Sequence, residues 1–243
     1  EEKYFQASDF SDAAFREGRF KQFEFVARML AYFQVTKGVR VELASGSPPG
    51  AGLGGSSAMG VTLYSALSEW CGHTLNSGED RHLAVRRTQG IESIILDKGP
   101  AGYQDYFPAL FGGILALKAC PGEVQVEQLY TPALASALES HLTLVYSGQT
   151  RLSGINNWEV YKAFFDRTGP ARQGLSKIAD LATEAYQAIK KGDGMGLVRL
   201  IGAEGDEREK LFPNILTPEM KKLGQEVKSA FKGAGQKVCG AGG

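Results

Sequence analysis

The chain has 243 residues, enough for one large domain or two modest ones with real cores. It carries 27 Lys plus Arg and 27 Asp plus Glu, so there is no net field to attract nucleic acid. No apolar run approaches the ~20 residues that a membrane helix needs. We therefore expect a globular protein of two unequal lobes, with neither nucleic acid nor a membrane as partner.

The three cysteines indicate a reducing compartment. Cys71, Cys120 and Cys239 are odd in number and show neither CxxC nor any other metal-ligand spacing. A disulfide framework is therefore disfavoured, and we expect a cytoplasmic protein.

The first part of the chain predicts a helix, a strand, a glycine loop and two further helices. Apolar residues at helical spacing predict an amphipathic helix over residues 8–34. Alternating apolar and charged residues over 39–43 predict a half-buried strand. A Pro- and Gly-rich stretch at 47–55 then leads into a helix of small and apolar residues over 57–70, and another helix is expected over 80–96.

The rest of the chain predicts two strands and three more helices. A Gly/Pro segment at 99–102, the run 103–111 and the Gly112-Gly113 turn lead into an apolar strand at 114–117. The second part opens with a predicted strand at 142–146. Helices are then expected near 157–165, 174–191 and 195–207, before a final glycine loop.

The glycine loop before residue 57 has the chemistry of a phosphate site. Backbone N–H groups and the positive end of the following helix attract anions. Glycine lets phosphate oxygens approach the backbone, and two serine hydroxyls can bind a phosphate oxygen or Mg²⁺. The pattern predicts a cradle for a triphosphate, formed by Pro49, Gly50, Ala51, Gly52, Leu53, Gly54, Gly55, Ser56, Ser57 and Ala58.

Three other interpretations of this loop are weaker. Gly50, Gly52 and Gly55 fit G-x-G-x-x-G, but a dinucleotide site needs an acidic residue closing a second strand, and residues 70–75 make no convincing strand. No lysine follows the glycines, which excludes a Walker-type NTPase. A flexible turn remains the third alternative, although six of the ten residues are Gly or Ser before an apolar helix.

Together with two later segments, the loop resembles the central motif of the GHMP kinases (galactokinase, homoserine kinase, mevalonate kinase and phosphomevalonate kinase). Gly102-Tyr103-Gln104-Asp105, followed by Phe111-Gly112-Gly113, resembles the family segment with the catalytic aspartate. Residues 235–243 resemble the last glycine motif. The Gln-Asp form, the Phe-Gly-Gly and the stretch 211–218 are most similar to the D-glycero-D-manno-heptose 7-phosphate kinase branch.

The resemblance implies an α+β fold with two lobes. Residues 1–135 would form the N-terminal, ATP-binding lobe, which is ribosomal protein S5 domain 2-like. Residues 136–243 would form a ferredoxin-like C-terminal lobe. The family's first motif has no counterpart before Glu1, and the sequence ends inside the last glycine motif. We therefore expect part of the acceptor site to lie outside this sequence.

Three residues are candidates for the chemistry. Asp105 is interpreted as the carboxylate that takes the proton of the acceptor hydroxyl, the alternative being a solvated loop aspartate. The resemblance implies Ser57 and Glu92 as Mg²⁺ ligands. Glu92 could instead be an ordinary exposed helix residue. Its neighbours Ile91, Ile94 and Ile95 are apolar, however, which suggests a partly buried carboxylate that needs a cationic partner.

The acceptor is expected to contact Gly102, Asp105, Arg151 and the final segment Gly240, Ala241 and Gly242. Arg151 could bind an anionic group of the acceptor in a bidentate way. A solvated surface arginine is the simpler interpretation. The final glycines could likewise form only a tight turn that closes a sheet.

The sequence thus predicts a kinase that uses ATP and Mg²⁺ to phosphorylate a hydroxyl of a sugar or sugar phosphate, with a heptose 7-phosphate implied as acceptor. Galactose, fucose and mevalonate are alternative acceptors, and a decarboxylase of the mevalonate type shares the fold. A non-catalytic sensor of ATP and sugar is a further alternative, although the chain retains Asp105, Ser57 and Glu92. Whether the protein acts as a monomer or a homodimer stays open.

Overall fold

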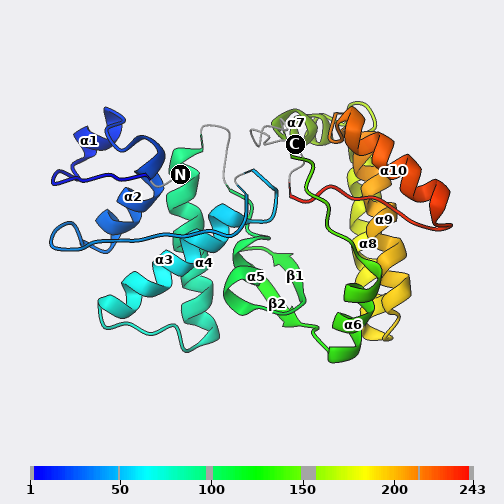
Figure 1. The fold of residues 1–243 in the computed structure, drawn as a ribbon, viewed down its shortest axis with the longest axis horizontal. Coiled ribbons are helices and arrows are strands. Elements are labelled where there is room, and N and C mark those ends of the chain that lie inside the picture. Colours follow the sequence, from blue (N-terminus) through cyan, green and yellow to red (C-terminus); the bar gives the residue numbers. More distant parts are fainter. Residues whose placement is uncertain (1–2, 49, 97–100, 149–156, 213, 241–243) are drawn as a thin grey trace. The chain divides into compact units, whose positions relative to one another are not determined.

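The computed structural model describes residues 3–48, 50–96, 101–148, 157–212 and 214–240. It is mostly helical, with one small sheet (Figure 1). The chain divides into two compact units. Unit 1 contains residues 1–46 and 54–112, and unit 2 contains residues 47–53 and 113–243. The boundary therefore falls inside the glycine loop, and each unit is described separately.

The regular secondary structure in the described part of unit 1 is all helical. Its longest helix, α4, begins with a capping box in which Ser77 Oγ accepts from the Asp80 backbone N–H and Asp80 Oδ2 accepts from that of Ser77, both at 3.0 Å. The elements in chain order are α1 (Asp12–Arg16), the 3-10 turn η1 (Lys21–Phe23), α2 (Glu24–Tyr32), α3 (Gly55–Trp70), α4 (Gly78–Ile95) and α5 (Tyr106–Phe111).

The single helix predicted over residues 8–34 is wrong, because the segment is divided. Helix α1 ends at Arg16, and Gly18 follows at a φ of 66°, a left-handed conformation that interrupts a right-handed helix. The chain then passes through η1 into α2. Three apolar residues of this segment are nevertheless buried together: Ala14, Phe20 and Ala27 form a small cluster of their own.

The main core of unit 1 lies among α2, α3 and α4. The segment predicted as a strand at 39–43 is not a strand in the structure, because no described segment pairs with it. The alternating pattern nevertheless places its apolar side chains on one side, since Val39 and Val41 pack against this core. The buried members of the core are Phe25, Met29, Leu30, Leu63, Tyr64, Leu67, Ala84 and Ile91.

Thr88 on α4 is fully buried, and its hydroxyl has no hydrogen-bond partner in the structure. An unsatisfied buried hydroxyl costs free energy that a methyl group does not. We expect Thr88→Val to raise the free energy of unfolding by about 1 kcal/mol, measured by urea denaturation. Thr62→Val, at an exposed position of α3, is the matched control and should change little. A less stable Thr88→Val protein would show that the hydroxyl is satisfied after all.

The described part of unit 2 contains a β-hairpin and five helices. Strands β1 (Leu115–Cys120) and β2 (Glu123–Gln128) pair antiparallel, with Leu115 opposite Gln128 and Cys120 opposite Glu123. The hairpin confirms a strand where one was predicted at 114–117, and its second strand was not predicted. The helices are α6 (Pro132–His141), α7 (Asn157–Phe165), α8 (Ala171–Lys190), α9 (Gly194–Leu211) and α10 (Pro218–Ala230).

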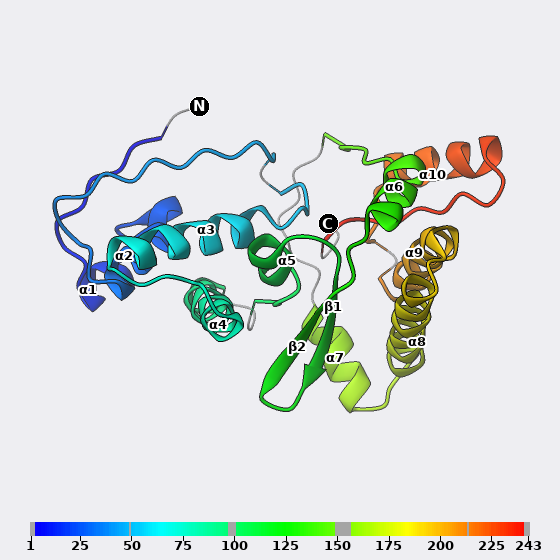
Figure 2. The ribbon, with the colours of Figure 1, turned by 90° about the horizontal axis from the view of Figure 1, so that it is seen from below.

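Helices α8 and α9 run side by side and form the largest contact of unit 2 (Figures 1 and 2). Helix α6 packs against α9, and α7 packs against α8. The hairpin is tied to α8 because Glu127 accepts hydrogen bonds from the Tyr186 hydroxyl and Lys190 Nζ, each at 2.9 Å. The predicted strand at 142–146 is wrong: its residues are exposed, and no segment in the described part of the chain pairs with them.

Glu204 on α9 links its own helix to the C-terminal segment. Its carboxylate pairs with Arg208, at 2.6 Å, and with Lys237, and its side chain is only 14% exposed. Burial, the largest single influence, raises the pKa of Glu204, but the hydrogen bonds and charges of Lys237 and Arg208 together outweigh it and leave the pKa below 4.5. The ionised form is therefore the one that stabilises unit 2.

A lowered folded-state pKa gives a definite pH dependence. The stabilisation by Glu204 is complete above 4.5, its unfolded value, and is lost as the pH falls through the lower folded value. We expect Glu204→Gln to lose about 1 kcal/mol of unfolding free energy at neutral pH. The difference from the parent protein should vanish in acid, as urea denaturation over a pH series would reveal. An equal loss at every pH would contradict this assignment.

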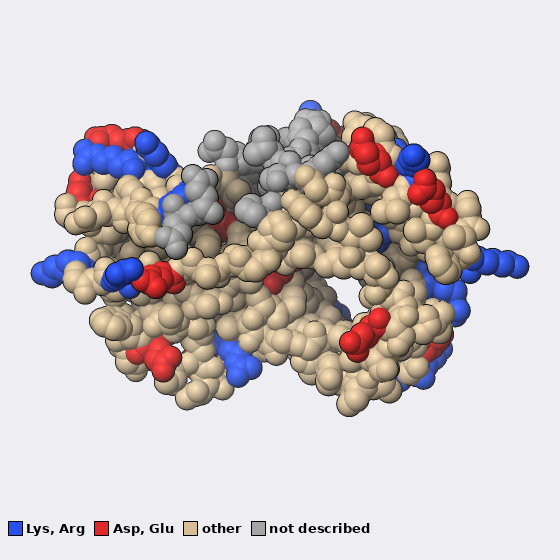
Figure 3. All heavy atoms as spheres, viewed as in Figure 1, with Lys and Arg blue, Asp and Glu red and all other residues tan. Residues whose placement is uncertain are grey.

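The mixture of helices and a small sheet is compatible with an α+β fold, although helix predominates. None of the helices in the described ranges is long and apolar enough to cross a membrane. On the face shown in Figure 3, basic and acidic side chains are interspersed, in keeping with equal numbers of each in the sequence.

Candidate active site

The start of α3 presents backbone donors. Gly54 is the N-cap residue, with a φ of 69° and a ψ of 24°, and its carbonyl accepts from the Ala58 N–H at 2.9 Å. No side chain caps this end. The N–H groups of the first helical turn have no intrahelical acceptor, so this end of α3 is suited to an anion such as phosphate. Ser56 is exposed there, whereas Ser57 is buried, at 5% exposure.

Asp105 lies directly against Gly54. A Cβ added to Gly54 would stand 3.0 Å from Asp105 Cβ and 3.3 Å from its Cγ. Asp105 is the N-cap residue of α5, yet its side chain does not cap that helix. Among the residues that the structure describes, none forms an ion pair with its carboxylate. Burial raises the pKa of Asp105 above 3.8.

Glu92 brings a second carboxylate to the same place. It lies on α4, is half-buried, and its Oε2 accepts a hydrogen bond from the Tyr106 hydroxyl. Burial raises the pKa of Glu92, the Ser56 hydroxyl opposes this by hydrogen bonding to the carboxylate, and the charge of Asp105 raises the pKa further. Side chains from α3, α4 and α5 therefore meet within unit 1.

The approach to Asp105 is anchored on the helix that carries Glu92. Gln89 Nε2 donates to the Ala101 carbonyl at 2.6 Å, and the Ala101 N–H donates to Ser93 Oγ at 3.0 Å. Gly102 follows, with the Gln104 side chain folded against its Cα. The segment that precedes Asp105 is thus held by Gln89, one turn before Glu92 on α4, and by Ser93, the residue after it.

The donor set at this site fits Mg²⁺. The carboxylate of Glu92 stands beside the Ser56 hydroxyl and near Asp105, whose charge raises the pKa of Glu92, and hard oxygen donors are the ligands that Mg²⁺ prefers. Neither carboxylate has an ion-pair partner in the described ranges. Nor does that part of the chain hold three or more His, Cys, Asp or Glu side chains grouped as for a metal. Mg²⁺ fits such a sparse site because it commonly binds one or two protein groups and takes its other ligands from phosphates and water.

The structure distinguishes the two serines. The hydroxyl that reaches Glu92 belongs to Ser56, whereas Ser57, predicted as the metal ligand, is buried at the base of the same turn. Ser56 was predicted only as an ATP contact. The role of Tyr106 was not predicted, and only its position beside Asp105 in an aromatic run could have drawn attention to it.

Unit 2 brings the two glycine segments into backbone contact. A Cβ on Gly52 would stand 2.6 Å from the Cys239 carbonyl oxygen, and one on Gly240 would stand 2.9 Å from the Gly52 carbonyl oxygen. The loop and the C-terminal motif, predicted separately as binding segments, are therefore neighbours. Four candidate residues lie outside the described ranges, namely Pro49, Arg151, Ala241 and Gly242.

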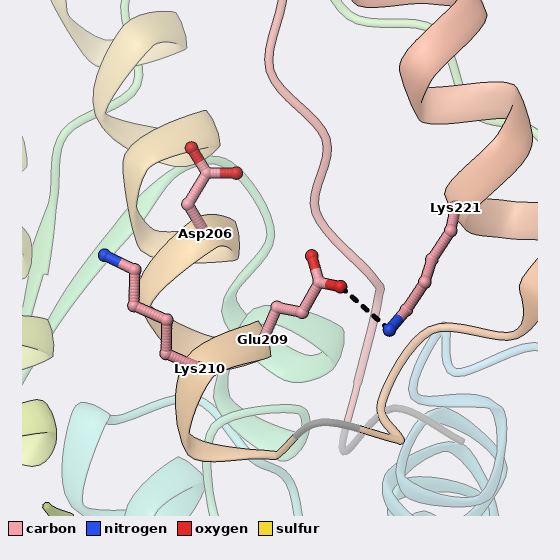
Figure 4. A pocket seen from close by; sticks show the side chains of 4 residues that line it. All are labelled: Asp206, Glu209, Lys210 and Lys221. Atoms are coloured by element: carbon pink, nitrogen blue, oxygen red, sulfur yellow. Dashed lines mark ion pairs between the residues drawn. The ribbon is translucent and has the colours of Figure 1, made fainter.

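An open hollow of about 560 Å³ lies elsewhere in unit 2, between α9 and α10 (Figure 4). Its lining residues are Asp206, Glu209, Lys210 and Lys221, and Lys221 pairs with Glu209 at 3.1 Å. Lys210 pairs with Glu207, and Asp206 pairs with Lys228. Its charges satisfy one another, and it contains none of the candidate site residues.

Comparison with known proteins points to one family. Residues 21–113, which include α3, α4 and Asp105, match the family described as GHMP kinases N terminal domain. The chain is 26% identical over 213 residues to the L-fucokinase/L-fucose-1-P guanylyltransferase of Bacteroides fragilis. It is 25% identical over 161 residues to the bifunctional fucokinase/GDP-fucose pyrophosphorylase of Arabidopsis thaliana, and 24% identical over 220 residues to the mevalonate kinase of Methanothermobacter thermautotrophicus.

These matches cover most of this chain but unequal shares of the relatives. They include 85%, 65% and 90% of the chain, respectively. They span only 21% and 15% of the two fucokinase proteins, and 67% of the mevalonate kinase. The similarity thus supports the GHMP kinase family, through its N-terminal domain, without singling out the heptose 7-phosphate kinase branch.

Proposed function

We propose that this protein is a GHMP-type kinase that transfers the γ-phosphoryl group of ATP to a hydroxyl of a sugar or sugar phosphate. The observation that carries this proposal is the position of Asp105, packed on Gly54 at the start of α3 with Glu92 beside it. The match of residues 21–113 to the family and the kinase names of the relatives support it.

In this proposal Asp105 handles the proton of the acceptor hydroxyl. The acceptor oxygen forms a bond to the γ-phosphorus while the bond from that phosphorus to the β–γ bridging oxygen breaks, so ADP leaves. The hydroxyl proton passes to the Asp105 carboxylate. Because burial raises the pKa of Asp105, its carboxylate is a stronger base than an exposed aspartate.

The remaining residues bind and orient the nucleotide. The N–H groups at the start of α3 donate hydrogen bonds to phosphate oxygens, and the glycine loop from residue 50 lets these oxygens approach the backbone. Glu92 and Ser57 are the proposed Mg²⁺ ligands, and the contact of Ser56 with Glu92 makes Ser56 a further candidate. The bound ion supplies positive charge that neutralises the phosphates during transfer.

The acceptor is proposed to be a sugar. The Gln-Asp and Phe-Gly-Gly pattern favours a heptose 7-phosphate, whereas the fucokinase names of two relatives introduce L-fucose as the principal rival. Gly102, Arg151 and the segment 240–242 remain the proposed acceptor contacts. The lobes proposed for residues 1–135 and 136–243 would be ribosomal protein S5 domain 2-like and ferredoxin-like.

A panel of acceptors tests this function. ADP release from Mg²⁺-ATP is measured with heptose phosphates, L-fucose, galactose, homoserine and mevalonates. Turnover confined to one sugar class would support the proposal and name the acceptor. Turnover with mevalonate alone would show that the acceptor is mevalonate and not a sugar. ATP binding without turnover on any acceptor would overturn the kinase and leave the sensor.

A further inference from the structure

Tyr106 is a buried tyrosine whose only polar atom is directed at the site. Its side chain has no exposed surface and is the largest among the fully buried ones in the structure. Burying a phenol is costly unless its hydroxyl finds a partner. The partner of Tyr106 is Glu92 Oε2, so a hydrogen bond runs from the base of α5 to the carboxylate on α4.

The chain places two functional contacts on consecutive residues. Asp105 packs on Gly54 at the start of α3, and Tyr106, the next residue, holds Glu92. The Ser56 hydroxyl also hydrogen bonds to Glu92. Glu92 is therefore held between α3 and α5, and its orientation depends on a hydroxyl that is itself locked by packing.

We propose that Tyr106 is a positioning residue: its hydroxyl fixes the carboxylate of Glu92 so that the remaining oxygen lone pairs face the start of α3, where a divalent cation is bound. This inference rests on the proposed function, because it assigns Glu92 to that cation. Hydrogen bonds that orient a metal-ligating carboxylate typically govern metal affinity or activity by 10–100-fold, about the size of effect expected here.

The test measures cation affinity directly. Mn²⁺, a paramagnetic stand-in for Mg²⁺, is titrated in the presence of ATP and followed by electron paramagnetic resonance. Tyr106→Phe keeps the ring and removes only the hydroxyl, so we expect the Kd for Mn²⁺ to rise about 10-fold. The same substitution should shift the Mg²⁺ concentration at half-maximal activity in the same direction.

Tyr64→Phe is the matched control. Tyr64 is another buried tyrosine of unit 1, and its side chain hydrogen bonds to Tyr32 on α2. Both variants lose one buried tyrosine hydroxyl and its hydrogen bond, but only Tyr106→Phe should weaken Mn²⁺ binding. Equal weakening in both variants would mean a general loss of structure and would overturn the proposal.

A double-mutant cycle isolates the pathway through Glu92. If Tyr106 acts by orienting Glu92, Tyr106→Phe should have no further effect on Mn²⁺ affinity in a Glu92→Gln background. Additive effects would overturn the positioning role, as would a Tyr106→Phe protein with parental affinity. If the parent protein binds neither Mn²⁺ nor ATP, the proposed function itself is overturned. This result comes from the parent protein alone, so it is distinguished from a failure of the positioning role, which only the variants reveal.

Discussion

Asp105→Asn should lower kcat by about 10²–10⁴-fold, the range that a positioned general base contributes. Asn has nearly the same shape but cannot accept the acceptor proton. Asp105 makes no ion pair in the described ranges and does not cap α5, so the substitution removes no identified structural contact of its carboxylate. The measurement is ADP release at saturating ATP and acceptor.

Two further measurements make this result specific. ATP affinity should stay within a few-fold of the parent value, because Asp105 faces the acceptor in the proposed reaction. Asp12→Asn, at an exposed position of α1, controls for the loss of one carboxylate from unit 1 and should leave kcat unchanged. An Asp105→Asn protein with parental kcat would rule out the assigned role.

Gly54→Ala should reduce kcat/KM by about 10-fold, because Asp105 must shift by a few tenths of an ångström, and displacing a reacting group by about 1 Å reduces it by about 10²-fold. The new methyl would stand 3.0 Å from Asp105 Cβ, which is tighter than most real Cβ contacts, so Asp105 or the start of α3 must give by a few tenths of an ångström. Gly54 also has a φ of 69°, where alanine is strained.

Gly72→Ala separates the strain from the collision. Gly72 also lies in unit 1, with a φ of 83°, but nothing stands within 4 Å of its potential Cβ. Both variants should lose about 1–2 kcal/mol of unfolding free energy through left-handed strain, and only Gly54→Ala should lose activity. Equal activity in the two variants would show that the contact between Gly54 and Asp105 has no catalytic importance.

The helices were predictable from sequence because their signals are local. Helix α3 begins within two residues of its predicted start and ends at Trp70 as predicted, and α4 covers the predicted range to within two residues. The capping box of Ser77 and Asp80 is a local sequence feature of the same kind. Glycine and serine patterns likewise identified the loop before α3 without any knowledge of distant contacts.

Strands were less predictable, because a strand requires a partner as well as a pattern. Residues 39–43 alternate as a strand does, yet in the structure they only cover one side of the unit 1 core. Residues 142–146 are apolar and extended in pattern but remain exposed and unpaired within the described ranges. By contrast, 115–120 forms a strand because a short turn places β2 beside it.

The site itself required tertiary structure. Asp105 was predicted from its motif and Glu92 from the family resemblance, but their mutual proximity depends on how α4 and α5 pack. Which serine hydroxyl reaches Glu92 depends on the rotation of α3, and sequence alone favoured Ser57. The contact between Tyr106 and Glu92 joins residues on two helices and has no sequence signature.

The most direct test of the central claim is to follow the phosphoryl group itself. The protein is incubated with Mg²⁺ and ATP carrying isotope-labelled γ-phosphoryl oxygens, together with each sugar of the panel, and the products are analysed by mass spectrometry. The account predicts one labelled phosphoryl group on a sugar, formed by the parent protein and not by Asp105→Asn. Label found only in inorganic phosphate, or retained in ATP with every acceptor, would contradict it.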